Sequence, residues 1–227
     1  MTRSPLPVQS VLSTQWRKMI ISGARGMGIH VTDDQMGHMF RFAQMLLEWN
    51  RRVNLTAITD PEEVAVKHFL DSMAALPYIP ENGRLLDIGS GGGFPGLVLA
   101  IFRPSLSITS IDSVRKKISF QRQLIRTLGL TSARAIHARA ESLTGKTEPY
   151  DIIVSRALGS LEMFVSLALP LISEEGELIA YKGIIDEGAG DEIESLTSQY
   201  NNHSIHVYRY LLPSSGDRRS LVFIKHR

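Results

Sequence analysis

The spacing of apolar residues along the chain changes near residue 84. Before that point, apolar side chains recur at intervals of three and four residues, as they do along one face of a helix. After it, short apolar runs alternate with amphipathic segments, which is the pattern of a mostly parallel sheet covered by helices. The sequence therefore predicts an α/β fold, with a helical N-terminal region over residues 1–80 that packs on a sheet domain over residues 81–227.

Three helices are predicted ahead of the sheet. The first covers about Val8 to Ser22, and the second follows Thr32, whose hydroxyl can cap it. The third begins at Asp60-Pro61-Glu62-Glu63, which offers a capping carboxylate and a proline at a position where its missing N–H is harmless. We expect the apolar stripe of the second helix to form core rather than a cofactor-binding site.

Seven strands are predicted in the second part of the chain. Five of them alternate with helices, and the last two follow a helix at 190–199 with only a turn-rich segment between them, so they should pair antiparallel. This is the Rossmann-like, mostly parallel seven-stranded sheet of class I S-adenosylmethionine-dependent methyltransferases, with an antiparallel last strand. The predicted strands are 85–88, 107–111, 133–136, 152–155, 178–181, 204–210 and 221–225.

A glycine-rich segment follows the first predicted strand. Gly91-Gly92-Gly93-Phe94-Pro95-Gly96 matches G-x-G-x-x-G, a weak signal because a nicotinamide-binding turn, or a turn with no ligand, would match it too. Asp87 stands two residues before Gly89, as in the first motif of methyltransferases. The glycines allow the backbone to approach the amino-acid end of a cofactor, and Asp87 can hold its ammonium directly or through water.

Two further acids stand at strand ends. Asp112 ends the second strand, where dinucleotide-binding folds place the acid that contacts ribose hydroxyls. Arg139-Ala140-Glu141 follows the third strand, where methyltransferases offer a backbone N–H and an acidic side chain to adenine. Each acid alone could be a helix N-cap. Three acids at the ends of three consecutive strands favour a methyltransferase site.

Two features of the sequence limit which atom can accept the methyl group. The chain has no cysteine, which excludes methyltransferases that attack carbon 5 of a pyrimidine through a thiolate. Val154-Ser155-Arg156-Ala157 stands where enzymes that methylate an exocyclic amine carry Asp/Asn-Pro-Pro-aromatic. Guanine N7 needs neither group, because its free lone pair requires only correct placement. These residues permit an N7 acceptor, and they leave hydroxyl, carboxylate and protein acceptors open.

The net charge is only +2, but basic residues concentrate at two places. Arg115, Arg122 and Arg126 fall on one side of a predicted helix, either as a phosphate-facing stripe or as a solvated face. Arg156 and Lys182 end the fourth and fifth strands, the edge where open α/β sheets bind ligands. We expect Arg156 to contact a guanine edge or a phosphate and Lys182 a phosphate, with a surface ion pair as the alternative.

Other groups are predicted to lie outside the chemistry. His68 stands on an apolar helix, where a histidine is more often structural than catalytic. The N-terminus lacks the apolar stretch of a signal peptide, and no run approaches the roughly 20 apolar residues that span a bilayer. Together with the absence of cysteine, this predicts a cytoplasmic protein without a membrane segment or a metal centre.

Short motifs carry a resemblance to a known family. They are Val53-Asn54-Leu55-Thr56 and Lys67-His68-Phe69-Leu70-Asp71-Ser72, upstream of the glycine turn, and Phe94-Pro95-Gly96 inside it. Further matches are Asp112-Ser113 with Lys116 and Phe120, 139–141, 151–157 and Lys182-Gly183. From about Met45 to the C-terminus the chain resembles ribosomal RNA small-subunit methyltransferase G, also called glucose-inhibited division protein B. The first thirty or so residues carry no such motif, and they are expected either to face RNA or to cover the sheet.

The resemblance implies a substrate, a product and a set of site residues. The substrate would be 16S rRNA or the small ribosomal subunit, including an assembly intermediate. The product would be N7-methylguanine in the decoding-region loop. S-adenosyl-L-methionine would be the methyl donor. We also expect the chain to act as a monomer. The cofactor-binding residues expected from motif and resemblance are Asp87, Gly89, Gly91, Phe94, Asp112, Ser113, Ala140, Glu141 and Arg156, and the expected catalytic residues are Arg156 and Lys182.

Two departures from the family pattern are visible, and two other functions stay open. Gln121 replaces the usual leucine and Leu158-Gly159 the usual small apolar pair, and we expect neither to touch the cofactor turn.

One alternative function is a methyltransferase that acts on a small molecule or a protein, which would need no basic surface at the crevice. The other is a nicotinamide-dependent oxidoreductase or a non-catalytic nucleotide sensor.

Overall fold

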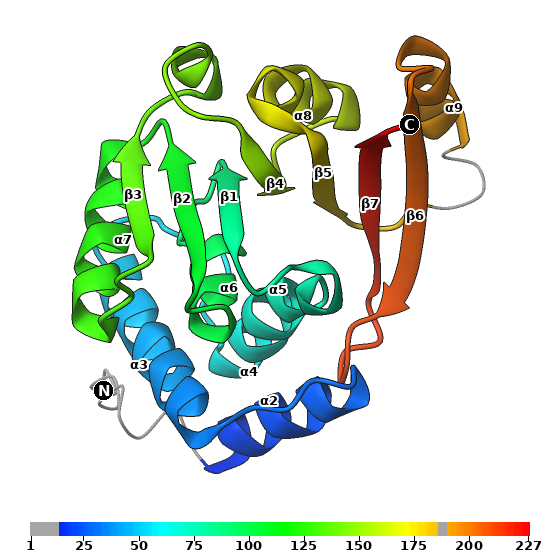
Figure 1. Ribbon diagram of the computed structural model, residues 1–227. Helices are drawn as coiled ribbons and strands as arrows, with labels where there is room; N and C mark the ends of the chain where they lie inside the picture. The colour runs from blue at the N-terminus through cyan, green and yellow to red at the C-terminus, as the bar shows by residue number, and fades with distance from the viewer. Residues whose placement is uncertain (1–13, 186–189) are drawn as a thin grey trace.

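The computed structural model describes residues 14–185 and 190–227, which form one seven-stranded sheet with helices packed against it (Figure 1). The strand order is β3-β2-β1-β4-β5-β7-β6, and β7 runs antiparallel to both of its neighbours. The strands are β1 (Gly83–Ile88), β2 (Leu106–Asp112), β3 (Ala133–His137), β4 (Tyr150–Arg156), β5 (Ile172–Lys182), β6 (His203–Leu211) and β7 (Arg218–His226). The predicted mostly parallel sheet with an antiparallel last strand is confirmed.

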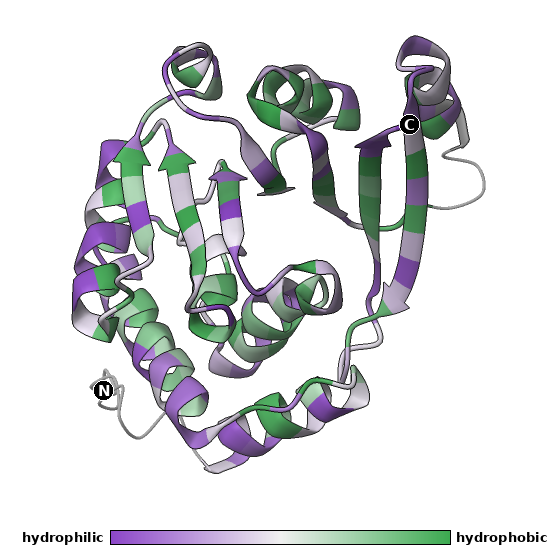
Figure 2. Ribbon diagram, viewed as in Figure 1, coloured by the Kyte–Doolittle hydropathy of each residue, from purple (hydrophilic) through white to green (hydrophobic). Residues whose placement is uncertain are grey.

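Alternation along the strands divides the apolar residues between two cores. On β1, Leu85 packs into one core and Leu86 and Ile88 into the other, because successive side chains of a strand point to opposite faces. The helices that follow the strands are α6 (Gly96–Phe102), α7 (Arg115–Leu128), α8 (Leu161–Ala168) and α9 (Gly190–Gln199). Short 3₁₀ turns are η2 (Leu76–Tyr78), which precedes β1, η3 (Ala140–Leu143) and η4 (Leu169–Leu171). Figure 2 shows hydrophobic residues along the strands and hydrophilic residues on the outer sides of α3 and α7.

The N-terminal region is helical, as predicted. It contains α2 (Thr14–Gly26), α3 (Asp33–Asn50), α4 (Pro61–Val64), the π-helix η1 (Ala65–Leu70) and α5 (Asp71–Met73). Thr32 and Gln35 form a reciprocal capping box at the start of α3, and the Asp60 carboxylate caps α4 by accepting the Glu62 and Glu63 N–H groups. Both predicted caps are therefore confirmed. The predicted first helix began at Val8, and its residues 8–13 lie outside the described residues.

The N-terminal helices share a core with one face of the sheet. Trp16 of α2, Phe42 of α3 and Leu85 of β1 belong to the same buried cluster. Because α2 buries Trp16 and Ile20 there, its described part covers the fold rather than presenting a free face on that side. The boundary at residues 80/81 stays a prediction, and the core is continuous across it. No helix in residues 14–185 or 190–227 is long and apolar enough to cross a membrane.

Candidate functional site

The glycine turn connects β1 to α6 and is tied to β2 by its own backbone. The N–H groups of Gly89 and Ser90 both donate to the Ile111 carbonyl, at 3.0 Å, and the Gly91 N–H donates to Asp112 Oδ2 at 3.0 Å. Gly89, Gly91 and Gly93 have φ values of +72°, +55° and +91°, which non-glycine residues rarely adopt. A side chain at Gly91 would have no atom closer than 3.9 Å, so this side of the turn is open.

A cavity of about 490 Å³ opens beside this turn. Its walls include residues 89–92 and 94 of the turn, residues 156–157 at the end of β4, residues 181–183 at the end of β5, and parts of the N-terminal helical region. It therefore lies at the carboxyl edge of the parallel strands, where the sequence places it. Five cationic side chains line it, Lys67, Lys117, Arg156, Lys182 and Arg219, against one carboxylate, that of Asp71. Four of the five cations also lie within 4 Å of an acid (Glu63, Asp71, Asp112 or Asp217), whereas Lys182 contacts only a carbonyl among the described residues, so the remaining positive charge at the cavity suits an anionic ligand.

Asp87 is fully buried under the turn. Its Oδ2 accepts the Gly96 N–H at 2.8 Å, whereas its Oδ1 has no partner among the described residues. Burial raises the pKa of this carboxyl to about 7, opposed by the Gly96 N–H and by the Arg156 charge. Asp87 is not one of the residues that line the cavity. Its contact with a cofactor ammonium stays a prediction.

Asp112 ends β2 and contacts the turn, and the residues predicted to bind adenine follow the neighbouring strand β3. Asp112 uses one carboxylate oxygen for the Gly91 N–H and the other for the Val114 N–H, at 2.8 Å, so it fixes the turn as well as the start of α7. Each oxygen keeps a lone pair that a ribose hydroxyl could use. The Ser113 carbonyl accepts a hydrogen bond from His137. Ala140 is buried and Glu141 is exposed on η3. The cofactor roles predicted for these residues stay predictions.

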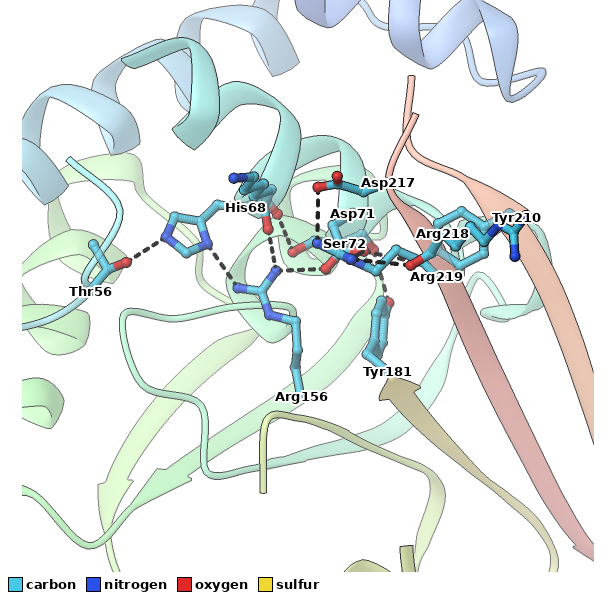
Figure 3. A network of polar contacts seen from close by, with 11 residues as sticks. Thr56, His68, Asp71, Ser72, Arg156, Tyr181, Tyr210, Asp217, Arg218 and Arg219 are labelled. Atoms are coloured by element: carbon cyan, nitrogen blue, oxygen red, sulfur yellow. Dashed lines mark hydrogen bonds and ion pairs between the residues drawn. The ribbon is translucent and has the colours of Figure 1, made fainter. Parts of the chain in front are cut away.

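Arg156 lies on the cavity wall, and both of its terminal nitrogens already have hydrogen-bond partners (Figure 3). Nη1 donates to the Lys67 carbonyl at 2.9 Å and to Asp71 Oδ2 at 3.1 Å, and Nη2 lies 3.1 Å from His68 Nδ1. The guanidinium carbon is 5.3 Å from the centroid of the Phe94 ring, a cation–π distance. Arg156 thus joins the end of β4 to the π-helix of the N-terminal region. The predicted contact with a base or a phosphate stays a prediction.

Asp71 organises a polar network that the sequence did not assign to the site. Besides Arg156, its carboxylate accepts the Tyr210 hydroxyl at 2.8 Å and lies 3.9 Å from Arg219 Nε. Tyr181 donates to the Ser72 carbonyl beside it, and these contacts connect η1 and α5 with β4, β5, β6 and β7 (Figure 3). The only signal for it in the sequence was the motif 67–72, which carried the family resemblance.

His68 lies in the cavity wall rather than in a purely structural position. Its ring stacks on Phe94, with centroids 4.6 Å apart and an interplanar angle of 16°. Nε2 lies 2.8 Å from Thr56 Oγ1 and Nδ1 faces Arg156. Burial, and then the neighbouring Arg156 charge, lower the pKa of His68 to about 3. The expectation that its polar atoms are satisfied within the fold agrees with these contacts, but the ring also borders the site.

The other predicted cations differ in their relation to the cavity. Lys182 lines it, and its Nζ donates to the Gly159 carbonyl at 2.6 Å rather than to an acid. Arg115, Arg122 and Arg126 are not among the lining residues, and Arg122 instead donates to the Ala135 carbonyl of β3. From α7 it is Lys117 that reaches the cavity. Among the described residues, no group of three or more His, Asp or Glu side chains could hold a metal ion.

The expectation that the two departures from the family pattern do not touch the turn is wrong. Gln121 is fully buried, and its Nε2 donates to Ser90 Oγ at 2.7 Å and to the Gly91 carbonyl at 2.9 Å. Leu158 packs so closely on Gly89 that a Cβ there would lie 2.9 Å from its Cδ1. The spacing of apolar residues along α7 predicted that one side of this helix is buried. It could not show that this side packs against the glycine turn after β1.

Comparison with known sequences gives one family over most of the chain. The family model described as GidB, rRNA small subunit methyltransferase G, matches residues 35–222. A protein named ribosomal RNA small subunit methyltransferase G from Geobacter sp. (strain M21) is 42% identical over 213 residues, covering 92% of this chain and 96% of the relative. One of the same name from Azoarcus sp. (strain BH72) is 40% identical over 211 residues, covering 93% and 97%.

Comparison with solved structures agrees on the fold. TrmN from Thermus thermophilus superposes with a TM-score of 0.55 at 18% identity, covering 70% of this chain and 48% of that one. Precorrin-6y C5,15-methyltransferase from Geobacter metallireducens GS-15 gives a TM-score of 0.54 at 12% identity, covering 69% and 86%. At these identities the likeness concerns the class I methyltransferase fold alone.

Proposed function

Because the chain belongs to the rRNA small subunit methyltransferase G family, we propose that the cavity beside the glycine turn is where it methylates a guanine of small-subunit rRNA. It is a 16S rRNA guanine methyltransferase that uses S-adenosylmethionine. The observation that carries the assignment of the site is the cavity itself. It brings the open side of the turn, the end of β4 and five cationic side chains to one edge of the sheet.

Two features of the turn fit S-adenosylmethionine. The backbone at Gly91 has open space where a side chain would stand, so a ligand can approach the main chain closely. Beneath it, Asp87 Oδ1 is a buried carboxylate oxygen without a partner among the described residues, which suits a cationic or N–H donor. We assign the amino-acid end of the cosubstrate to Asp87 and Gly89, its ribose to Asp112, and its adenine to the Ala140 N–H and Glu141.

Methyl transfer to guanine N7 requires little from the protein beyond correct placement of the two reactants. When bound, the cosubstrate supplies a methyl group on a sulfonium, so the N7 lone pair forms the new N–C bond while the C–S pair stays on sulfur. N7 carries no proton, so the chain needs no general base. Its residues must hold the guanine in line with the methyl group and exclude water, and this proximity supplies most of the rate enhancement. A cationic wall also raises the local concentration of RNA phosphates.

The basic residues of the cavity support an RNA substrate over a small molecule. Lys67, Lys117, Lys182 and Arg219 line it together with Arg156, and Lys182 has no acid as a partner among the described residues. We assign Lys182 to a phosphate, because the Gly159 carbonyl occupies only one of its three N–H donors. We further propose that the chain acts as a monomer in the cytoplasm, on small-subunit rRNA before or after it is assembled with ribosomal proteins.

Mapping of modified nucleotides in ribosomal RNA tests this function. Small-subunit rRNA from cells without the gene should lack one N7-methylguanine that is present in cells with it, and a plasmid copy should restore it. Calorimetry with S-adenosylhomocysteine should give a binding signal that NAD does not give. An unchanged modification map would overturn the RNA assignment, and tight NAD binding without S-adenosylhomocysteine binding would overturn the methyltransferase assignment.

A further inference from the structure

Thr56 lines the cavity from the loop between α3 and α4, and its backbone is held in place by Asn50. Asn50 Oδ1 accepts the N–H groups of Leu55 and Thr56, at 2.7 and 3.0 Å, and its Nδ2 donates to the Thr56 carbonyl at 2.9 Å. The position of the Thr56 hydroxyl is therefore set by the fold. The proton on this hydroxyl can be located by following the hydrogen bonds that surround it.

The first step concerns the tautomer of His68. Arg156 Nη2 lies 3.1 Å from His68 Nδ1, and a guanidinium has only donors, so Nδ1 must be the acceptor. The ring is neutral, consistent with its low pKa. A neutral imidazole with an unprotonated Nδ1 carries its proton on Nε2. His68 therefore donates to Thr56 Oγ1, 2.8 Å away, and cannot accept from it.

The second step concerns the threonine oxygen. Besides His68 Nε2–H, Thr56 Oγ1 accepts the backbone N–H of Ile58 at 3.0 Å. A hydroxyl oxygen has two lone pairs, and both are now used. Its own hydrogen remains to be donated, and the described residues offer no acceptor for it. Since Thr56 is one of the residues that line the cavity, its O–H is available as a donor to a molecule that enters.

We infer that Thr56 donates this hydrogen bond to O6 of the guanine that is methylated, and so selects guanine over adenine. The inference rests on the proposed function. Guanine has the O6 acceptor next to N7, whereas adenine has the N6 amino donor at that place. A hydroxyl that can donate but not accept satisfies O6 and leaves N7 free to react. It opposes an N6 amino group with another donor. His68 and Arg156 are then positioning residues, because they orient the Thr56 proton.

The test pairs a protein change with a substrate change. Thr56→Val removes the hydroxyl and keeps the shape, Thr56→Ser keeps the hydroxyl, and Thr127→Val changes an exposed threonine of α7 as a matched control. Each variant receives small-subunit RNA with either guanine or 2-aminopurine, which has N7 but lacks O6, at the mapped position. The readouts are the dissociation constant of the RNA with S-adenosylhomocysteine present, and kcat/KM for methylation.

For the wild type, Thr56→Ser and Thr127→Val, 2-aminopurine should weaken binding and kcat/KM roughly 5- to 100-fold, the range for one lost hydrogen bond whose partner is left unsatisfied. For Thr56→Val, binding and kcat/KM with guanine RNA should already be weakened by a similar factor. Replacing guanine by 2-aminopurine should then cause no further loss. A purely structural role of Thr56 predicts instead that the two losses multiply, and that result would overturn the inference. S-adenosylhomocysteine affinity checks that the variant is folded; if Thr56→Val is not, Thr56→Cys, with its weak thiol donor, takes its place.

The proposed function and this inference fail in different ways. If the wild type does not methylate guanine in the RNA, the proposed function is wrong and the inference is wrong with it. If the wild type methylates guanine and treats 2-aminopurine equally well, only the role of Thr56 is wrong.

Discussion

Arg156 and Asp71 form an ion pair between the end of β4 and the junction of η1 with α5, with Nη1 3.1 Å from Oδ2. The two side chains are only 16% and 7% exposed. The same carboxylate accepts the Tyr210 hydroxyl of β6, and the same guanidinium reaches the Lys67 carbonyl and His68 (Figure 3). The pair therefore holds one wall of the cavity together with the edge of the sheet.

Removing Asp71 should cost far more stability than removing an exposed ionic partner. Asp71→Ala leaves Arg156 buried without its counter-charge, and we expect the free energy of unfolding to fall by about 3 kcal/mol or more. Glu81→Ala is the matched control, because Glu81 pairs with Arg103 while 74% exposed, and it should change stability by less than about 1 kcal/mol. Urea denaturation measures both. Equal, small losses in the two variants would show that the buried pair is not a structural junction.

Adding a methyl group to Gly96 should disrupt the floor of the turn. A Cβ there would lie 2.7 Å from Asp87 Oδ2 and 3.0 Å from Ser110 Oγ, both fully buried. Gly96→Ala should therefore lower the free energy of unfolding by about 1–3 kcal/mol and abolish S-adenosylhomocysteine binding. Gly37→Ala on the exposed side of α3, where a Cβ would meet nothing within 4 Å, should instead stabilise the protein by about 0.5–1 kcal/mol. Thermal and urea unfolding measure the change in stability of each variant relative to the wild type. Changes in the same direction for both variants would contradict the prediction.

Asp87 should make stability depend on pH in a specific window. Its pKa in the folded protein is about 7, above its ordinary value of 3.8, so the folded state holds this proton more tightly than the unfolded state does. The contribution of this carboxyl to stability is thus fully present below its unfolded pKa and is lost as pH rises through about 7. Urea denaturation measures the free energy of unfolding at about pH 5 and about pH 8. From the lower to the higher pH, this free energy should decrease more for the wild type than for Asp87→Asn. An equal decrease in the two proteins would contradict the prediction.

Glu141 should contribute to cofactor affinity and not to folding. Its side chain is exposed and forms no hydrogen bond or ion pair with the described residues. Glu141→Ala should weaken S-adenosylhomocysteine binding about 10-fold, in the range for a hydrogen bond to a charged group, while the melting temperature stays unchanged. Asp112→Ala should lower both affinity and stability, because the Gly91 and Val114 N–H groups lose their acceptor. Calorimetry measures the effect on affinity and thermal unfolding the effect on stability, and Glu148→Ala, at an exposed position, is the control. Unchanged affinity in Glu141→Ala would remove it from the site.

Much of the fold could be predicted from local sequence, because each signal spans only a few residues. The caps at Thr32 and Asp60 depend on a side chain and the N–H groups two or three positions later. The strands show as short apolar runs, and the glycine turn shows as Asp87 followed by glycines at positions that need a positive φ. The carboxyl ends of parallel strands meet at one edge, so the sequence also placed the cavity there.

The contacts within the cavity could not be predicted in this way. Arg156 meets partners 85 to 89 residues away in the chain, and Gln121 supports a turn 30 and 31 residues away. Hydrophobic periodicity shows which side of α7 is buried, but not that Lys117 reaches the cavity while Arg122 bonds to β3. Those outcomes depend on how far each element is shifted along its neighbour.

The sequence by itself determined the order of helices and strands, the glycine turn and the acids at the strand ends, since these follow from residues close together in the chain. Only the tertiary structure decided which cations face the cavity and which have their donors engaged elsewhere. It also decided the proton on His68, and with it the donor that Thr56 presents, because that proton depends on a guanidinium 88 residues away in the chain. Hydrogen-bond direction is set by the whole network of neighbours in space, and no short segment of sequence contains that network.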